Sequence, residues 1–233
     1  MSDDASIIAQ LEQVTTATLT TILLKKGLRN IWIRSAFPLR PGQERLVGRA
    51  FTFRFIPARE DMATPASWGN PISTRAAIEA MPEGCIAVID GNGESDAGVF
   101  GDILCARMAK RNVKAMITDG VVRDLSGVLS TGLPVWAAGA AAPPSVAGLT
   151  FVNWEEPIGC GGVAVFPGDM IVADLDGAVV IPAALVDEIV PEAIEQEAME
   201  GWIMEQVGEG VPLPGLYPMN AETKARYEAF RKR

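Results

Sequence analysis

The sequence predicts an α/β fold: a single compact layered domain around a mixed β-sheet, followed by a C-terminal helical arm. Short apolar segments at 85–90 and 114–118 flank a helical pattern, an alternation typical of α/β architectures. Between 163 and 182, short apolar strands alternate with Pro-Gly-Asp and Asp-Leu-Asp-Gly turns. From 183 onward a long helical pattern begins, so residues 1–182 are expected to form the core and residues 183–233 the arm.

The elements before the first of these strands follow from apolar spacing. Residues 6–26 read as two helical stretches that end at Gly27. Residues 46–56 read as a strand, because Phe51, Phe53 and Phe55 recur with period 2 and therefore share one face. The stretch 59–70 reads as a loop and 73–80 as a short helix.

The middle of the chain brings two distant motifs to one edge of the sheet. A helix over 103–111 runs about 14 Å, and after a turn at Asn112 a strand over 114–118 returns about 16 Å. Because the two lengths nearly cancel, the chain leaves the edge at Asp102 and returns to it at Arg123 and Asp124. Ligands of open α/β sheets bind at this carboxyl edge.

The remaining elements lead into the arm. Residues 134–138 read as a strand, 163–182 as short strands joined by turns, and 183–207 as a long helix rich in Glu. A Gly/Pro loop at 208–218 and a charged helix at 221–231 close the chain. An arm of this kind is expected to pack on a neighbouring subunit.

Composition restricts the function classes. The 233 residues carry a net charge of −9, which argues against a nucleic-acid partner. No secretory signal opens the sequence and no apolar run approaches the roughly 20 residues that span a bilayer, so we expect a cytoplasmic protein without membrane contact. The three cysteines lack CxxC spacing and fit reduced packing thiols, Cys105 among them. The chain has no histidine, which excludes Ser-His-Asp and Cys-His mechanisms.

Two interpretations of Asp102 remain open from the residues alone. It stands where a helix N-cap would accept the N–H of Cys105, a purely structural role. In the functional interpretation its carboxylate orients a metal-bound water, and the backbones of Gly101, Ile103 and Leu104 cradle a substrate carboxylate at the helix N-terminus.

Arg123 and Asp124 also allow two interpretations. Such a dipeptide is commonly an ordinary surface ion pair. At a strand end opposite Asp102, however, the guanidinium of Arg123 suits a carboxylate or keto oxygen. Asp124 suits a hard cation such as Mg²⁺ or Mn²⁺.

With these residues in place, the chain resembles the ribonuclease-activity-regulator-A-like (RraA-like) family. That family includes the class II 4-hydroxy-4-methyl-2-oxoglutarate/4-carboxy-4-hydroxy-2-oxoadipate aldolases. The motif that carries the resemblance is Gly101-Asp102, twenty residues, then Arg123-Asp124. The stretch 165–182 resembles the family's late β-hairpin region, and the match extends from about residue 15 to 210.

The resemblance implies a divalent-metal-dependent lyase that cleaves a carbon–carbon bond of a 2-keto acid and releases pyruvate. The reaction would be retro-aldol cleavage of 4-hydroxy-4-methyl-2-oxoglutarate-type substrates, oxaloacetate decarboxylation, or both. Asp124 would ligate Mg²⁺ or Mn²⁺, Asp102 would hold a metal-bound water, and Arg123 with the backbone of 101–104 would bind pyruvate. The metal and Arg123 would stabilise an enolate.

The resemblance also implies trimers or pairs of trimers, with the active site between subunits. A glutamate from the neighbour's arm would complete that site, and Glu200 is the first candidate, with Glu197 second. The chain departs from the family's aldolases in lacking acids between Asp124 and Glu155 and an aspartate in the early helix, which leaves the aldol acceptor open. The alternative function is a non-catalytic protein-binding regulator of a ribonuclease, whose acidic surface would dock on a basic partner.

Overall fold

A nine-stranded mixed sheet forms the centre of the computed structural model, which describes residues 4–232. Eight strands follow the order β1-β9-β8-β3-β4-β5-β6-β2, and β7 pairs with β3. The α/β prediction is confirmed. The strands are β1 (Trp32–Ile33), β2 (Phe37–Pro38), β3 (Leu46–Pro57), β4 (Ile86–Asp90), β5 (Ala115–Thr118), β6 (Val135–Ala137), β7 (Leu149–Trp154), β8 (Met170–Asp174) and β9 (Gly177–Ile181).

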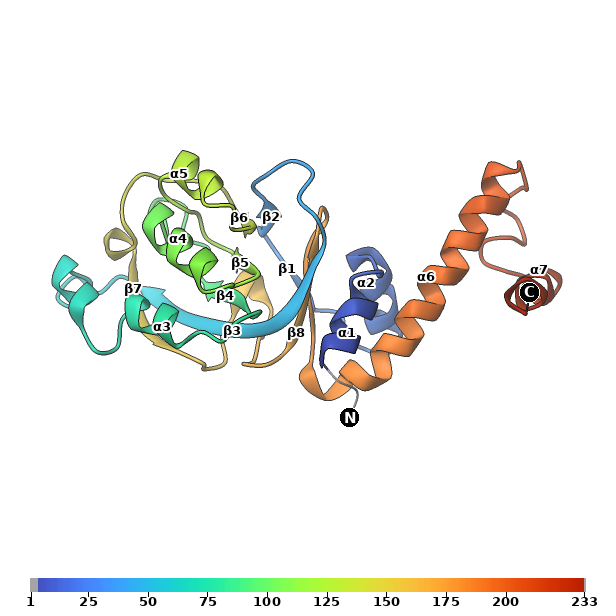
Figure 1. Cartoon of the computed structure of the whole chain (residues 1–233), viewed down its shortest axis with the longest axis horizontal. Coiled ribbons are helices and arrows are strands. Elements are labelled where there is room, and N and C mark those ends of the chain that lie inside the picture. The colour runs from blue at the N-terminus through green and yellow to red at the C-terminus, as the bar shows by residue number, and fades with distance from the viewer. Residues whose placement is uncertain (1–3, 233) are drawn as a thin grey trace.

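Seven α-helices lie around this sheet in the described part of the chain. Figure 1 shows α4 and α5 toward one end of the molecule and α1, α2 and α6 toward the other. The helices are α1 (Asp4–Leu11), α2 (Thr16–Lys25), α3 (Thr74–Ala80), α4 (Asp102–Lys110), α5 (Leu125–Ser130), α6 (Val186–Gly208) and α7 (Ala221–Arg231).

The long strand β3 joins the two halves of the sheet (Figure 1). Its first residues pair antiparallel with β8, and from Ala50 it pairs parallel with β4. Phe51, Phe53 and Phe55 are buried in one cluster, as their spacing predicts. The ring of Phe53 lies 5.5 Å from that of Phe51 and 5.4 Å from that of Phe100. Strand β3 therefore anchors the segment just before Asp102.

The parallel strands β3, β4, β5 and β6 carry α4 and α5 as crossover helices. Because β4 and β5 are parallel, the loops that follow Asp90 and Thr118 emerge at one sheet edge. The expected departure at Asp102 and return at Arg123 is confirmed.

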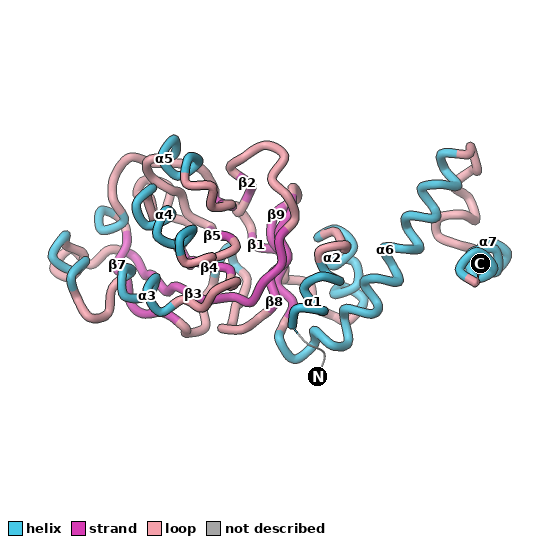
Figure 2. Tube along the Cα trace, viewed as in Figure 1, coloured by secondary structure: helices cyan, strands magenta, loops and turns pink. Residues whose placement is uncertain are grey.

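The opposite half of the sheet is covered by α1, α2 and the first part of α6 (Figure 2). Beyond this contact, α6 projects away from the sheet and α7 folds back beside its distal end (Figures 1 and 2). The arm has its own small core, in which the rings of Trp202 and Tyr227 lie 5.5 Å apart. Its packing on a neighbouring subunit stays a prediction.

The sequence-based elements need three corrections. Residues 163–166 form no strand but a single bridge between Val165 and Ile158, because the turn at Cys160–Gly162 interrupts pairing. Helix α5 and strands β1, β2 and β7 were not expected. The stretch 59–70 contains a short 3₁₀ helix, Pro65–Gly69.

No single helix among residues 4–232 is long and apolar enough to cross a membrane. Helices α1 and α2 reach that length and composition only as a pair, and they are bent by 107° with respect to each other.

Candidate functional site

A pocket of about 480 Å³ opens at the carboxyl ends of β4 and β5. One wall contains Asp102, Arg123 and Asp124, the three residues of the sequence motif. Trp68 and Arg75, which sequence reasoning did not select, line the same pocket. The fold therefore collects the motif residues into one cavity.

Backbone hydrogen bonds hold the two loops of the motif against each other. The N–H of Arg123 donates to the carbonyl of Phe100 at 2.9 Å, and that of Val99 donates to Val121 at 2.8 Å. Phe100 is 1% exposed and packs into the aromatic cluster of β3. Burial of such a ring contributes roughly 2–3 kcal/mol to the stability of the fold. This packing holds the segment before Asp102 against β3.

Glycines allow the close approach of these loops. A Cβ on Gly98 would lie 2.4 Å from the backbone nitrogen of Arg123. A Cβ on Gly101 would lie 2.8 Å from Asp124 Oδ2, and one on Gly127 would lie 2.6 Å from Asp102 Oδ2. Both carboxylates therefore sit in cradles that any larger residue would fill.

Asp124 combines a strained backbone with an accessible side chain. Its φ of 52° lies in the left-handed region, which aspartate tolerates better than most residues. It stands at the N-cap of α5 without a side-chain capping bond, and Arg123 Nε donates to its Oδ2 at 3.0 Å. The side chains of Arg123 and Asp124 are 36% and 45% exposed. The pair therefore faces the pocket rather than the core.

The capping role considered for Asp102 is wrong. Gly101 occupies the N-cap, and its carbonyl accepts the N–H of Cys105 at 3.1 Å. Asp102 is the first helical residue, and its Oδ1 accepts the adjacent N–H of Ile103 at 2.7 Å. Helix α4 begins with its own backbone bond, so the Asp102 carboxylate is not needed to start it.

The predicted substrate-binding backbone lies at the pocket as well. Gly101, Ile103 and Leu104 line it, and Ile103 is 79% exposed. The N–H of Ile103 is already accepted by Asp102 Oδ1. The other N–H groups of a first helical turn lack acceptors within the helix, and the helix dipole favours anions there. The start of α4 can therefore hold a carboxylate group.

The donor set fits one hard cation that keeps several water ligands. Asp102 and Asp124 supply two pocket-facing carboxylates, and Mg²⁺ typically takes one or two together with waters and substrate oxygens. No three Asp, Glu or Cys side chains converge as a metal cluster anywhere in residues 4–232. Gly101 and Gly127 let both carboxylates approach the backbone of the facing segment closely, which a side chain at either position would prevent.

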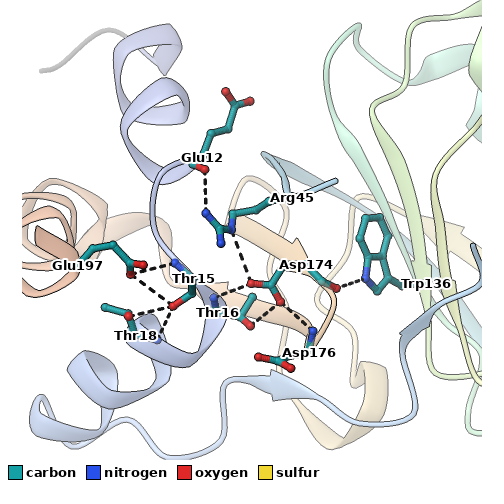
Figure 3. Close-up of polar contacts among 9 residues, drawn as sticks. All are labelled: Glu12, Thr15, Thr16, Thr18, Arg45, Trp136, Asp174, Asp176 and Glu197. Atoms are coloured by element: carbon teal, nitrogen blue, oxygen red, sulfur yellow. Dashed lines mark hydrogen bonds and ion pairs between the residues drawn. The ribbon is translucent and has the colours of Figure 1, made fainter. Parts of the chain in front are cut away.

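The glutamates of α6 lie outside this pocket within one chain. Glu197 accepts the N–H and the hydroxyl of Thr15 at 3.2 and 3.3 Å, so it binds the start of α2 (Figure 3). Glu200 accepts the hydroxyl of Thr18 at 3.3 Å and the amide of Gln196 at 2.7 Å. Either residue would reach a pocket of this kind only on another subunit.

Two arginines of the pocket were missed by sequence reasoning. Arg75 lies on α3 with its guanidinium 4.8 Å from the centre of the Trp68 ring, and Arg107 forms two 2.7 Å hydrogen bonds with Glu79. Arg107 lies on α4, the helix that begins with Asp102, whereas nothing in the sequence spacing links Arg75 to the motif, because α3 reaches the pocket only through tertiary packing. The placement of Trp68 in a charged loop was the only available signal.

The buried side of α4 carries packing rather than chemistry. Cys105 is fully buried, and burial raises the pKa of its thiol to about 12. A thiol with that pKa is protonated at neutral pH and is a poor nucleophile. The expectation of a packing thiol is confirmed.

Comparisons with known proteins give the same family as the motif. Residues 15–180 match the RraA-like family, described as Aldolase/RraA. The putative 4-hydroxy-4-methyl-2-oxoglutarate aldolase of Halalkalibacterium halodurans is 31% identical over 57% of this chain and 62% of its own length. Protein DlpA of Legionella pneumophila is 29% identical over 89% of this chain, which spans only 32% of DlpA.

Solved structures agree with this result. RraAS2 of Streptomyces coelicolor, titled an unusual member of the RNase ES inhibitor RraA protein family, has a TM-score of 0.76 and 30% identity over 87% of this chain and 97% of its own. An uncharacterized protein from Pseudomonas syringae has a TM-score of 0.78 and 26% identity, over 91% and 97% of the two chains. The match at 15–180 contains the whole Asp102 and Arg123-Asp124 motif, and the glutamates of α6 lie beyond it. By this match, and by the fold that brings the motif into one pocket, the chain belongs to the RraA-like family of aldolases and RraA proteins.

Proposed function

We propose that this protein is a divalent-metal-dependent lyase that cleaves a carbon–carbon bond of a 2-keto acid and releases pyruvate. The observation that carries the proposal is the convergence of Asp102, Arg123 and Asp124 at one pocket. The name of the H. halodurans relative supports the aldolase class. Suitable reactions are retro-aldol cleavage of 4-hydroxy-4-methyl-2-oxoglutarate and decarboxylation of oxaloacetate.

Asp124 is the proposed metal ligand, with Asp102 binding the cation through water. Mg²⁺ or Mn²⁺, when bound, polarises the keto group and offsets the negative charge that cleavage leaves on it. Arg123 adds a fixed positive charge beside the same oxygen, where its guanidinium is held by Asp124 Oδ2. The N-terminus of α4 orients the carboxylate end of the substrate.

The proton that the cleaved product needs would come from a carboxylic acid or from water, because the chain has no histidine. Asp102 lines the pocket, and we assign it the role of holding this water. We propose Glu200 of a neighbouring subunit as the second group, in a trimer or a pair of trimers. Glu197 is the second choice, because it accepts both the backbone N–H and the hydroxyl of Thr15, whereas Glu200 accepts only side-chain groups, those of Thr18 and Gln196.

The direct test measures pyruvate release from oxaloacetate and from 4-hydroxy-4-methyl-2-oxoglutarate, with Mg²⁺, with Mn²⁺ and with EDTA. The proposal predicts turnover above the free-metal background that EDTA abolishes. Folded, metal-supplied protein that turns over neither compound contradicts it. In that case a pull-down for a bound ribonuclease tests the regulator alternative, which the similarity to RraAS2 supports.

A further inference from the structure

The pocket holds three guanidinium groups, and they differ in what neutralises them. Arg123 is paired with Asp124 at 3.0 Å, and Arg107 is paired with both carboxylate oxygens of Glu79. Arg75 has no carboxylate partner among the described residues: its hydrogen bond is to the hydroxyl of Thr74, at 3.4 Å. Arg75 is therefore the pocket arginine whose charge remains available to a ligand.

The surroundings of Arg75 hold it in place. Its guanidinium stacks on the Trp68 ring at 4.8 Å, and Ser73 caps α3 by accepting the N–H of Ala76 at 3.3 Å. Loss of solvent around Arg75 lowers its pKa, yet arginine stays charged in proteins. A fixed, partly desolvated guanidinium binds a carboxylate more strongly than one in open water.

Arg75 and the motif residues lie on the walls of one cavity. The pocket that contains Asp124 and the start of α4 also contains Trp68 and Arg75. A ligand whose 2-keto acid end lies at Asp124 and Arg123 therefore has a second cationic contact within the same space.

We propose that Arg75, stacked on Trp68, binds a second carboxylate at the far end of the substrate, so that the enzyme selects dicarboxylic over monocarboxylic 2-keto acids. This inference rests on the proposed function and deepens it. The half of the substrate that is released then carries a negatively charged carboxylate. This narrows the identity of the aldol acceptor, which the motif residues alone do not determine. Arg75 acts here as a specificity residue: it binds the carboxylate on the half of the aldol substrate that is released, and it moves no proton.

The test compares two substrates that differ in one group. Retro-aldol cleavage of 4-hydroxy-4-methyl-2-oxoglutarate gives two pyruvates, whereas 4-hydroxy-4-methyl-2-oxopentanoate gives pyruvate and acetone. We expect Arg75→Gln to lower kcat/KM for the dicarboxylate about 10- to 100-fold, the loss of one charged hydrogen-bonded contact. It should leave kcat/KM for the monocarboxylate nearly unchanged, and Arg75→Lys should recover part of the loss.

Arg107→Gln is the matched control, because Glu79 already neutralises that arginine, and it should leave the ratio of the two kcat/KM values as in the wild type. If Arg75→Gln lowers kcat/KM equally for both substrates, Arg75 only supports the fold, and the inference is overturned. An unchanged ratio overturns it as well.

A binding measurement separates this inference from the proposed function. Calorimetry with excess Mg²⁺ compares 2-oxoglutarate with 2-oxobutyrate, neither of which needs to react. The inference predicts tighter binding of 2-oxoglutarate by the wild type and loss of that preference in Arg75→Gln. Equal affinities in the wild type overturn it. If the wild type cleaves no aldol substrate, the proposed function fails, while the calorimetry still decides the role of Arg75.

Discussion

Two aspartates at the starts of helices, Asp174 beside α2 and Asp124 before α5, show how differently this chain uses the same side chain. Asp174 is 9% exposed and accepts the N–H of Thr16 at 2.9 Å and its hydroxyl at 2.7 Å. It also accepts the N–H of Asp176 at 3.0 Å and lies 3.6 Å from Arg45 (Figure 3). The side chain of Asp124 is half-exposed, and within residues 4–232 its one polar partner is the adjacent Arg123.

The difference separates structural from functional carboxylates. Donors of the chain itself satisfy Asp174, which ties the turn between β8 and β9 to α2 (Figure 3). The carboxylate of Asp124 can still accept hydrogen bonds or bind a ligand in the pocket. To hold it there, the fold places Asp124 in a left-handed backbone conformation. Strain of this kind persists at sites where the surrounding structure over-determines it.

The largest expected effect is on turnover in Asp124→Asn. Asparagine tolerates the left-handed backbone but replaces the metal-binding carboxylate with a neutral amide. We expect kcat/KM for pyruvate release to fall about 10³-fold or more, roughly 4 kcal/mol. The free energy of unfolding in urea should change by less than about 0.5 kcal/mol, as for other exposed sites. Retained activity contradicts the ligand assignment.

The second effect compares the two glutamates of α6. Glu200→Gln should lower kcat about 10²-fold, the size of a general acid–base contribution. Glu197→Gln should leave kcat near the wild type and slightly lower stability, because a neutral amide oxygen accepts the Thr15 N–H and hydroxyl more weakly than a carboxylate does. Mixing Glu200→Gln with Asp124→Asn subunits should restore activity, since hybrid oligomers then contain intact sites. No recovery on mixing, with subunit exchange verified, rejects a site shared between subunits.

Asp174→Asn is the counterpart of the first variant. The NH₂ group of asparagine would face the N–H of Thr16 or of Asp176, and two donors cannot form a hydrogen bond. The free energy of unfolding should therefore fall by about 2 kcal/mol. The urea midpoint measures this loss. At a temperature where the variant is folded, kcat/KM should match the wild type. A large activity loss without destabilisation would reverse the assignment of the two aspartates.

The smallest effect concerns two buried thiols, Cys85 just before β4 and Cys105 within α4. Burial raises the pKa of both Cys85 and Cys105 to about 12, so almost no thiolate exists at pH 8 in the folded protein. A thiol reagent should label neither residue in native buffer and should label both in urea. Cys105→Ala should leave kcat/KM unchanged. Rapid native labelling of Cys105 would show that α4 does not pack as described.

The sequence predicts those features of the site that local length and pattern determine. The lengths of α4 and β5 were enough to bring Asp102 to Arg123, because each element has a fixed rise per residue. The register of Phe51, Phe53 and Phe55 follows from strand alternation. The capping role of Asp102 failed because the exact residue that begins a helix depends on backbone geometry that composition does not reveal.

The missed features depend on packing between distant segments. Arg75 and Trp68 reach the pocket through the placement of α3 and its preceding loop, which no spacing in the sequence encodes. Helix α5 contains Ser126 and Gly127 and has weak helical propensity, so its existence depends on packing beside Asp102. The hydrogen bond from Thr16 to Asp174 likewise joins residues that are 158 positions apart in the chain.

The most direct test of the contrast between Asp124 and Asp174 is Mn²⁺ binding, monitored by electron paramagnetic resonance. Oxalate is present as a stand-in for the pyruvate enolate. The account predicts that the wild type and Asp174→Asn bind Mn²⁺ alike, whereas Asp124→Asn leaves the free Mn²⁺ signal undiminished. Binding by Asp124→Asn equal to that of the wild type would contradict the assignment of this pocket as the metal and keto-acid site.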